Sequence, residues 1–240
     1  MKLHFFSYRY SQEILQHENN RVAWFEIENI LRSAPLFVYP NKTPKNKRLS
    51  VVQQLMNTYF DRRFAVDFDW LYHPLATRIS DSGLAADFRK TFPNITIQAE
   101  VQFGNMARWY SDIFKLQTAY SQSLVDCGLC VVPVSSLAKK IDSNIAEFER
   151  VCREIPAANL SITLPILIVG LEVDESTSIV DVSSCQFANL NQIVGKGNEA
   201  NRWRVVNGYI DGVPMSEISA RSPRGRHLFD PKVPDDTDPL

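Results

Sequence analysis

Two apolar runs separated by a helix-length segment most constrain the fold of this chain of 240 residues. Residues 127–133 are too short for a helix and are bounded by turn-forming residues, so they predict a central strand buried on both faces. Residues 164–171 predict a further core strand. Between them, Ser135 and Ser136 precede a helical pattern that extends over residues 137–154. A strand, a helix and a strand in this order predict two parallel strands, because parallel pairing needs a long connection. The fold class is therefore expected to be α/β.

The composition is that of an ordinary globular protein. Hydrophobic residues make up 45% of the chain, which excludes disorder throughout. No run of about 18 apolar residues is present, so we expect no membrane partner. Residues 1–10 have too short an apolar centre for a signal peptide, so a cytoplasmic location is expected.

Cysteine spacing argues against a zinc site, and the net charge argues against a surface that is basic throughout. Cys127 and Cys130 are the only close pair, and no second Cys or His pair lies at zinc spacing, so buried free thiols are expected at all four cysteines. The net charge of −1 argues against a protein coated by nucleic acid. It leaves room for a basic cleft, because residues 42–48 and 221–226 are basic while residues 235–238 are acidic.

Residues 95–105 hold the candidate chemistry. Their alternation predicts a strand with Glu100 and Gln102 side by side on one face. Asp87 precedes Glu100 by thirteen residues, and Pro93-Asn94 is a suitable turn, so an antiparallel hairpin would bring Asp87 back to Glu100.

This hairpin predicts a site for a hard cation. Asp87 and Glu100 would supply carboxylates, the Val101 carbonyl a further oxygen, and Gln102 would position a water. Mg²⁺ suits one or two carboxylates completed by waters and phosphate oxygens, and it promotes attack on a phosphate.

The pattern resembles the D…(E/D)-x-K signature of the PD-(D/E)xK nuclease superfamily, with Gln102 at the lysine position. The sequence of residues 100–105, Glu-Val-Gln-Phe-Gly-Asn, resembles that of the BglII/BstYI group of type II restriction endonucleases. Asp87-Phe88 matches an Asp-Phe pair of the same group. The loop between the two carboxylates is longer here, and Asp81 is the alternative for the first. The resemblance covers roughly residues 50–173.

The resemblance implies a fold, a reaction and partners. The fold is a restriction-endonuclease-like mixed β-sheet of about five strands flanked by helices. The reaction is Mg²⁺-dependent cleavage of double-stranded DNA at a short palindrome, with Asp87, Glu100 and Gln102 as catalytic residues and Asp87, Glu100 and Val101 as metal ligands. A homodimer, a cognate DNA methyltransferase and a bacterial or archaeal cell are also implied.

Periodicity predicts the remaining elements. Residues 2–10 are expected to form an edge strand, and residues 20–33, 50–63 and 105–124 are expected to form helices, while residues 203–206 look like a strand. Residues 1–174 would be the catalytic core, and residues 175–240 an irregular C-terminal extension that includes a possible DNA-contacting arm.

Three groups of residues are candidates for DNA contact. Gly104 and Asn105 lie at a helix N-terminus where members of the similar group contact DNA, although capping alone explains Asn105 equally well. Lys45, Lys47 and Arg48 belong to a basic loop that either contacts phosphates or is simply solvated. Arg224 and Arg226 belong either to an arm or to an unattached tail.

Three other functions remain open at this point. The chain could be a structure-specific nuclease for repair or nicking, or a catalytically silent DNA-binding protein of the same fold. A small-molecule enzyme with Glu100 as general base lacks a cofactor loop. The resemblance also implies a further active-site side chain near residues 70–74, but no motif identifies it. His73 is one candidate, and a packed surface histidine is the alternative.

Overall fold

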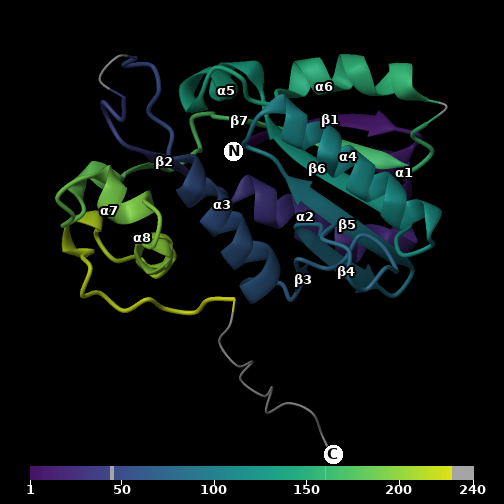
Figure 1. The fold of residues 1–240 in the computed structure, drawn as a ribbon. Coiled ribbons are helices and arrows are strands. Elements are labelled where there is room, and N and C mark those ends of the chain that lie inside the picture. Colours follow the sequence, from purple (N-terminus) through teal and green to yellow (C-terminus); the bar gives the residue numbers. More distant parts are fainter. Residues whose placement is uncertain (44–45, 160, 229–240) are drawn as a thin grey trace, which may run out of the picture.

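The computed structural model describes residues 1–43, 46–159 and 161–228. Six strands form a mixed sheet in the order β1-β7-β6-β5-β4-β3 (Figure 1). The β5/β6 and β6/β7 pairs are parallel, whereas the β1/β7, β4/β5 and β3/β4 pairs are antiparallel. The strands are β1 (Lys2–Tyr8), β3 (Leu71–Tyr72), β4 (Phe88–Phe92), β5 (Ile95–Val101), β6 (Cys127–Pro133) and β7 (Ile166–Glu172).

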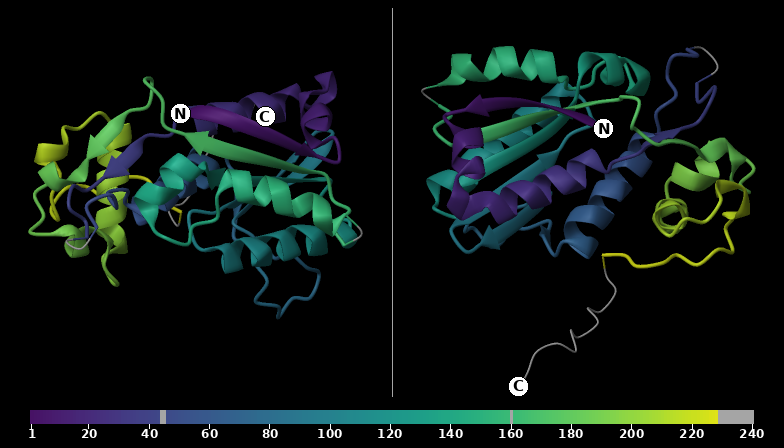
Figure 2. Two further views of the ribbon diagram at one scale, coloured as in Figure 1. Left: turned by 90° about the horizontal axis from the view of Figure 1, so that it is seen from above. Right: turned by 180° about the vertical axis from the view of Figure 1, so that it is seen from behind.

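Helices cover both faces of this sheet. Figure 1 shows α4 crossing the front face with α5 and α6 above it, and the view from behind in Figure 2 shows α2 and α3 on the opposite face. The elements are α1 (Ser11–Gln16), η1 (Glu18–Asn20), α2 (Arg21–Arg32), α3 (Gln53–Asp61), η2 (Arg62–Asp67), α4 (Met106–Ser121), α5 (Ser135–Ile141), α6 (Phe148–Glu154) and η3 (Ile155–Ala158).

The core is divided by the sheet into two hydrophobic clusters. The larger cluster packs α2 and α3 against residues such as Ile97 and Leu129, and the smaller one packs α4 and α6 against residues such as Ile166 and Ile168. Strand β6 is buried along its whole length, as the apolar run predicts. Its parallel pairing with β7 confirms the prediction from the strand–helix–strand order.

The connection between β6 and β7 differs from the prediction, because two short helices replace one long helix. The predicted helix over residues 137–154 is wrong, because α5 ends at Ile141 and α6 begins at Phe148. Asp142 follows α5 with an extended backbone, and its carboxylate accepts from the N–H of Ser143. Asp, Ser and Asn in succession favour such local bonds over a continued helix. The main sheet also has six strands instead of about five.

The C-terminal part of the chain forms a second, smaller unit. Strand β2 (Leu36–Val38) pairs in parallel with β8 (Ile179–Asp181), and η4 (Val182–Ser184), α7 (Leu190–Val194), α8 (Glu199–Ile210) and η5 (Met215–Glu217) follow. Figure 1 shows α7 and α8 beside α3, at the end of the molecule away from α6. The strand expected at residues 203–206 is wrong, because these residues lie in α8 with Val205 and Val206 buried. Burial of one face of a helix overrides the β preference of this short apolar run.

The structure also bears on membrane spans and on the cysteines. In the described ranges, no helix is long and apolar enough to cross a membrane. All four cysteines are free, and three of them are buried. Burial raises the pKa of the Cys127 thiol to about 12, so this residue is an unreactive part of the core.

Candidate active site

The hairpin of β4 and β5 brings Asp87 and Glu100 together. Phe88 pairs with Ala99, so the next pair in this register is Asp87 with Glu100. The backbone N–H of Val101 donates to Asp87 Oδ2 at 2.9 Å, which ties the start of β4 to the end of β5. Asp81, the alternative first carboxylate, is exposed and lies in the preceding loop. The two carboxylates predicted from the sequence are therefore neighbours.

A cavity of ≈ 370 Å³ opens beside this hairpin. Asp87, Val101 and Gln102 contribute to its wall from the hairpin, and α3 and α4 close the other sides. The cavity also contains side chains that sequence reasoning did not single out, namely Asn57, Asp61, Tyr72, Arg108, Asp112 and Lys115. It is therefore a concave, strongly polar site between the two helices and the end of β5.

Glu100 is the most buried charged group of the site, with no exposed surface. Its Oε2 accepts from Lys115 Nζ at 2.7 Å, while its Oε1 has no hydrogen-bond partner among the described residues. Burial raises the pKa of Glu100 to about 9, and the nearby Asp87 and Asp112 add to the rise while Lys115 opposes it. A carboxylate in such a place is stabilised by a further cation.

Burial also raises the pKa of Asp87, but by less than it raises the pKa of Glu100. Burial raises the pKa of Asp87 to about 6, and the hydrogen bond from Val101 and the charge of Lys115 limit the rise. The hydrogen bond within the hairpin thus favours the ionised form of Asp87 and opposes part of the effect of burial.

Gln102 is fixed at both ends of its amide. Nε2 donates to Asp112 Oδ2 at 2.6 Å, and Oε1 accepts from the backbone N–H of Gly104 at 2.6 Å. Only one orientation of the amide satisfies both partners. A Cβ atom at Gly104 would lie 2.5 Å from Gln102 Oε1, so this position must be glycine for Gln102 to keep its place. The Gln-Phe-Gly order of the sequence thus has a local structural reason.

Asp61, Asp112 and Lys115 are three of the charged residues of the site that sequence reasoning missed. Asp112 and Lys115 stand three residues apart on α4 and form an ion pair of 2.8 Å, a spacing that in the sequence is indistinguishable from a surface pair. Asp61 ends α3, and burial raises its pKa to about 7, with Asp87 adding to the rise. No motif marks any of the three.

His73 lies at the wall of the cavity with a left-handed backbone of φ 50°. Its ring stacks on Tyr72 with centroids 3.8 Å apart, and burial followed by the charge of Lys115 lowers the pKa of His73. A neutral imidazole at this position can exchange a hydrogen bond with a substrate.

The residues expected to contact DNA lie in three places. Asn105 caps α4, since its Oδ1 accepts from the N–H of Arg108 at 3.1 Å, and with Gly104 it lines a second hollow of ≈ 360 Å³. Lys47 and Arg48 are exposed in the loop before α3. Lys45 lies outside the described residues.

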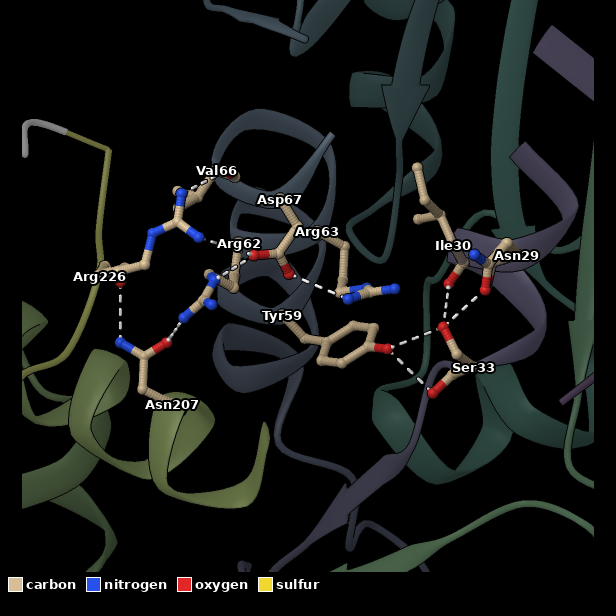
Figure 3. A network of polar contacts seen from close by, with 10 residues as sticks. All are labelled: Asn29, Ile30, Ser33, Tyr59, Arg62, Arg63, Val66, Asp67, Asn207 and Arg226. Atoms are coloured by element: carbon tan, nitrogen blue, oxygen red, sulfur yellow. Dashed lines mark hydrogen bonds and ion pairs between the residues drawn. The ribbon is translucent and has the colours of Figure 1, made fainter. Parts of the chain in front are cut away.

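Arg224 and Arg226 belong to a segment that is fastened to the core. Asn207 Nδ2 on α8 donates to the carbonyls of both arginines. Figure 3 shows its contact with Arg226 and the acceptance by Asn207 Oδ1 from the guanidinium of Arg62. The guanidinium of Arg226 donates to the carbonyl of Val66 at 3.1 Å. The described part of this segment is therefore held along its backbone and is not an unattached tail.

The donor atoms suit a hard cation. Glu100 Oε1 is buried without a partner among the described residues, Asp87 lies opposite Glu100 in the hairpin register, and Val101 follows Glu100 at the cavity wall. Within the described ranges no three His, Cys, Asp or Glu side chains are grouped as a metal site. Two carboxylates and a carbonyl form the partial set that Mg²⁺ completes with waters and phosphate oxygens.

Comparison with known proteins decides the family. A family model described as restriction endonuclease BglII/BglIII matches residues 3–171. The chain belongs to this restriction endonuclease family. It is a type II site-specific DNA endonuclease, as the resemblance of residues 100–105 predicted. Residues 172–240 lie outside the match.

Solved structures of the BglII/BglIII family have a similar fold. The crystal structure of restriction endonuclease BglII complexed with a DNA 16-mer matches with a TM-score of 0.59 and 20% identity, covering 74% of this chain and 79% of that chain. The crystal structure of free BglII matches with a TM-score of 0.49 and 17% identity, covering 74% of this chain and 82% of that chain. No curated protein matches the chain. The first comparison confirms the restriction-endonuclease-like α/β fold, a mixed sheet flanked by helices.

Proposed function

We propose that the protein cleaves double-stranded DNA at a short palindrome by Mg²⁺-dependent hydrolysis of phosphodiester bonds. Asp87, Glu100 and the Val101 carbonyl would hold the cation, and Gln102 would orient the attacking water. The observation that supports this proposal most is that Asp87 lies opposite Glu100, one position beyond the Phe88–Ala99 pair, while Glu100 Oε1 is buried without a partner among the described residues.

The chain's own residues have distinct tasks in this proposal. When bound, Mg²⁺ supplies a water of lowered pKa and neutralises charge that develops on the phosphate. An amide does not remove protons at neutral pH, so Gln102 orients the water without acting as its base. Gln102 Oε1 accepts one hydrogen bond from Gly104 and has a second lone pair for that water. The proton then passes to a substrate phosphate oxygen or to solvent.

Double-stranded DNA would lie across the two hollows of the site. Gly104 and Asn105 line the second hollow, where the N-terminus of α4 favours phosphate and the Asn105 amide suits a base edge. Lys45, Lys47 and Arg48 would contact phosphates from the loop before α3, and Arg224 and Arg226 would do so from the C-terminal segment. The BglII structure with a similar fold contains a DNA 16-mer, which supports a duplex as the substrate.

Two copies of the chain would act together. A palindrome has a two-fold axis, and one site per chain cuts both strands when the protein shares that axis. Tyr110 and Phe114 expose 48% and 62% of their surface on α4, which supports this helix as the homodimer interface. A cognate DNA methyltransferase would protect the cytoplasmic DNA of the bacterial or archaeal host.

The chain would be divided into two parts. Residues 1–174 contain every element of the main sheet and would form the catalytic core. Residues 175–240 would form an extension that is joined to the core through the β2/β8 pair and through Asn207.

Plasmid cleavage tests the proposed function. Purified protein is incubated with a plasmid of known sequence in Mg²⁺ and in EDTA, and the ends of the products are mapped. Discrete bands that require Mg²⁺ and share one palindromic sequence are expected. Cleavage that depends on branched or damaged DNA would instead indicate a structure-specific nuclease. Folded protein that binds DNA without cleavage in Mg²⁺ or Mn²⁺ would indicate a silent binding protein.

A further inference from the structure

Lys115 carries the only lysine side chain in the wall of the cavity among the described residues, and it comes from a helix outside the sequence motif. Its side chain is 13% exposed, and its Nζ lies 2.7 Å from Glu100 Oε2 and 2.8 Å from Asp112 Oδ1. A buried ammonium is costly unless it is paired and hydrogen-bonded. Two short contacts to two carboxylates therefore fix Lys115 in one position.

Asp112 extends this contact to the second motif residue. Its Oδ1 pairs with Lys115, and its Oδ2 accepts from Gln102 Nε2 at 2.6 Å. Glu100 and Gln102 project from the same face of the β5 segment, and each is thus bound by one member of the Asp112–Lys115 pair. One turn of α4 holds both side chains of the Glu-Val-Gln motif.

The two oxygens of Glu100 have different surroundings. Oε2 is bound to Lys115, and Oε1 is buried without a partner among the described residues. Rotation of the carboxylate would exchange these oxygens only by breaking the contact with Lys115. One ammonium does not balance Asp87, Glu100 and Asp112, so the cluster keeps net negative charge for a cation at Oε1.

We propose that the Asp112–Lys115 pair positions the motif: Lys115 holds Glu100 Oε2 so that Oε1 is presented to the cation, and Asp112 holds the Gln102 amide. This pair supplies from α4 the ammonium that residue 102, being Gln, does not supply from β5. Lys115 and Asp112 are positioning residues, because each acts through a motif residue. The inference rests on the proposed role of Glu100 as a metal ligand.

Binding of Mn²⁺ to the full chain without DNA tests the inference by isothermal titration calorimetry. Lys115→Met removes the ammonium and is expected to weaken Mn²⁺ binding about 10–100-fold, the usual effect of losing a group that orients a metal ligand. Lys115→Arg keeps the charge and its donors, so it should bind Mn²⁺ more tightly than Lys115→Met does. Lys139→Met, which removes an exposed lysine on α5, is the matched control with unchanged binding.

A cleavage readout separates positioning from general damage to the fold. In Lys115→Met the Mg²⁺ concentration for half-maximal plasmid cleavage should rise by the same factor as the Mn²⁺ dissociation constant. Circular dichroism checks that the variant is folded. If it is not, Lys115→Gln, whose uncharged amide is one bond shorter than the lysine side chain and so does not reproduce the contact with Glu100 Oε2, takes its place, and Mn²⁺ should still bind more weakly than in the wild type.

The outcomes distinguish this inference from the proposed function. Folded Lys115→Met or Lys115→Gln protein with the Mn²⁺ affinity of the wild type overturns the positioning role, even when the wild type cleaves DNA. A wild-type protein that neither binds Mn²⁺ nor cleaves the plasmid overturns the proposed function, and the inference with it.

Discussion

The backbone N–H of Val101 donates to Asp87 Oδ2 at 2.9 Å, so the first carboxylate of the site closes the hairpin that carries the second. Asp87 thus has a structural hydrogen bond on Oδ2 in addition to its proposed role as a metal ligand. A substitution that keeps an acceptor at this position separates the two roles, because Asn retains a side-chain oxygen for Val101.

Asp87→Asn should reduce plasmid cleavage by about a thousandfold or more, because the loss of a metal-binding charge removes several kcal/mol of stabilisation of the reaction. DNA binding in a mobility-shift assay should remain close to that of the wild type. Asp81→Asn, in the exposed loop before β4, is the control and should cleave normally. Equal losses in both variants would argue against Asp87 as the first carboxylate.

Glu100→Ala should abolish cleavage and leave most of the DNA binding intact. The change removes the buried Oε1 that would face the cation together with the partner of Lys115. Cleavage and mobility-shift assays on one preparation measure both properties. Retained nuclease activity in a clean preparation of Glu100→Ala would contradict the assignment of the whole site.

Gln102→Ala should reduce the cleavage rate less than the loss of either carboxylate does. It removes an orienting amide, bonded to Asp112 and Gly104, but no metal ligand. A loss of about 10–100-fold in cleavage rate is expected, as for other groups that position a site. The measurement is a single-turnover rate at saturating Mg²⁺. A loss as large as that of Glu100→Ala would mean that Gln102 has a direct role in the chemistry.

The ionisation of Asp61 should make the stability of the fold depend on pH. Burial raises its pKa from 3.8 to about 7, so between these pH values the folded protein binds a proton that the unfolded chain has released. The ionisation of Asp61 therefore destabilises the fold increasingly as pH rises from about 4 to 7. One pKa unit corresponds to about 1.4 kcal/mol, so Asp61→Asn should increase the free energy of unfolding by at least about 1 kcal/mol at pH 8.

Urea unfolding in EDTA, at pH 4 and at pH 8, measures this effect. The stabilisation by Asp61→Asn should be small at pH 4, which lies close to the unfolded pKa of 3.8, because the difference in proton binding between the two states accumulates mainly above that pH. An equal change at both pH values would show that the substitution acts through packing and not through the charge of Asp61.

The sequence predicts the hairpin and its carboxylates because both depend on local order. Alternation along β5 places Glu100 and Gln102 on one face, and a turn at Pro93-Asn94 fixes the register that returns Asp87 to Glu100. Strand β6 was predictable for a similar reason, since a strand enclosed on both faces is apolar along its length, and the apolar run that precedes Glu172 marked β7 as a further core strand.

The parts that the sequence does not predict depend on contacts between distant elements. Lys115 and Asp112 look like a surface pair until α4 packs over β5 and buries them. Asp61 enters the site only because α3 ends at the cavity. The run at residues 203–206 has β-forming residues, yet α8 forms there because Val205 and Val206 pack into the core from one helical face.

Asn207 links the C-terminal segment to the core, and its removal should release that segment. Its amide binds the carbonyls of Arg224 and Arg226 on one side and Arg62 on the other, as Figure 3 shows for Arg62 and Arg226. Gly225 lies between the two arginines with φ +71°, and a Cβ there would lie 2.7 Å from Asn207 Nδ2.

Asn207→Ala leaves the buried guanidinium of Arg62 without this acceptor, so it should lower the free energy of unfolding by about 1–3 kcal/mol. Trypsin should then cut after Arg224 or Arg226 well before it cuts the wild type, since cleavage requires the backbone to leave α8. Gly225→Ala should have the same effect on proteolysis through the clash with Asn207, and Asn159→Ala, at an exposed site, is the control. Mass spectrometry of the first fragments identifies the cut. Unchanged digestion of Asn207→Ala would mean that other contacts hold the segment.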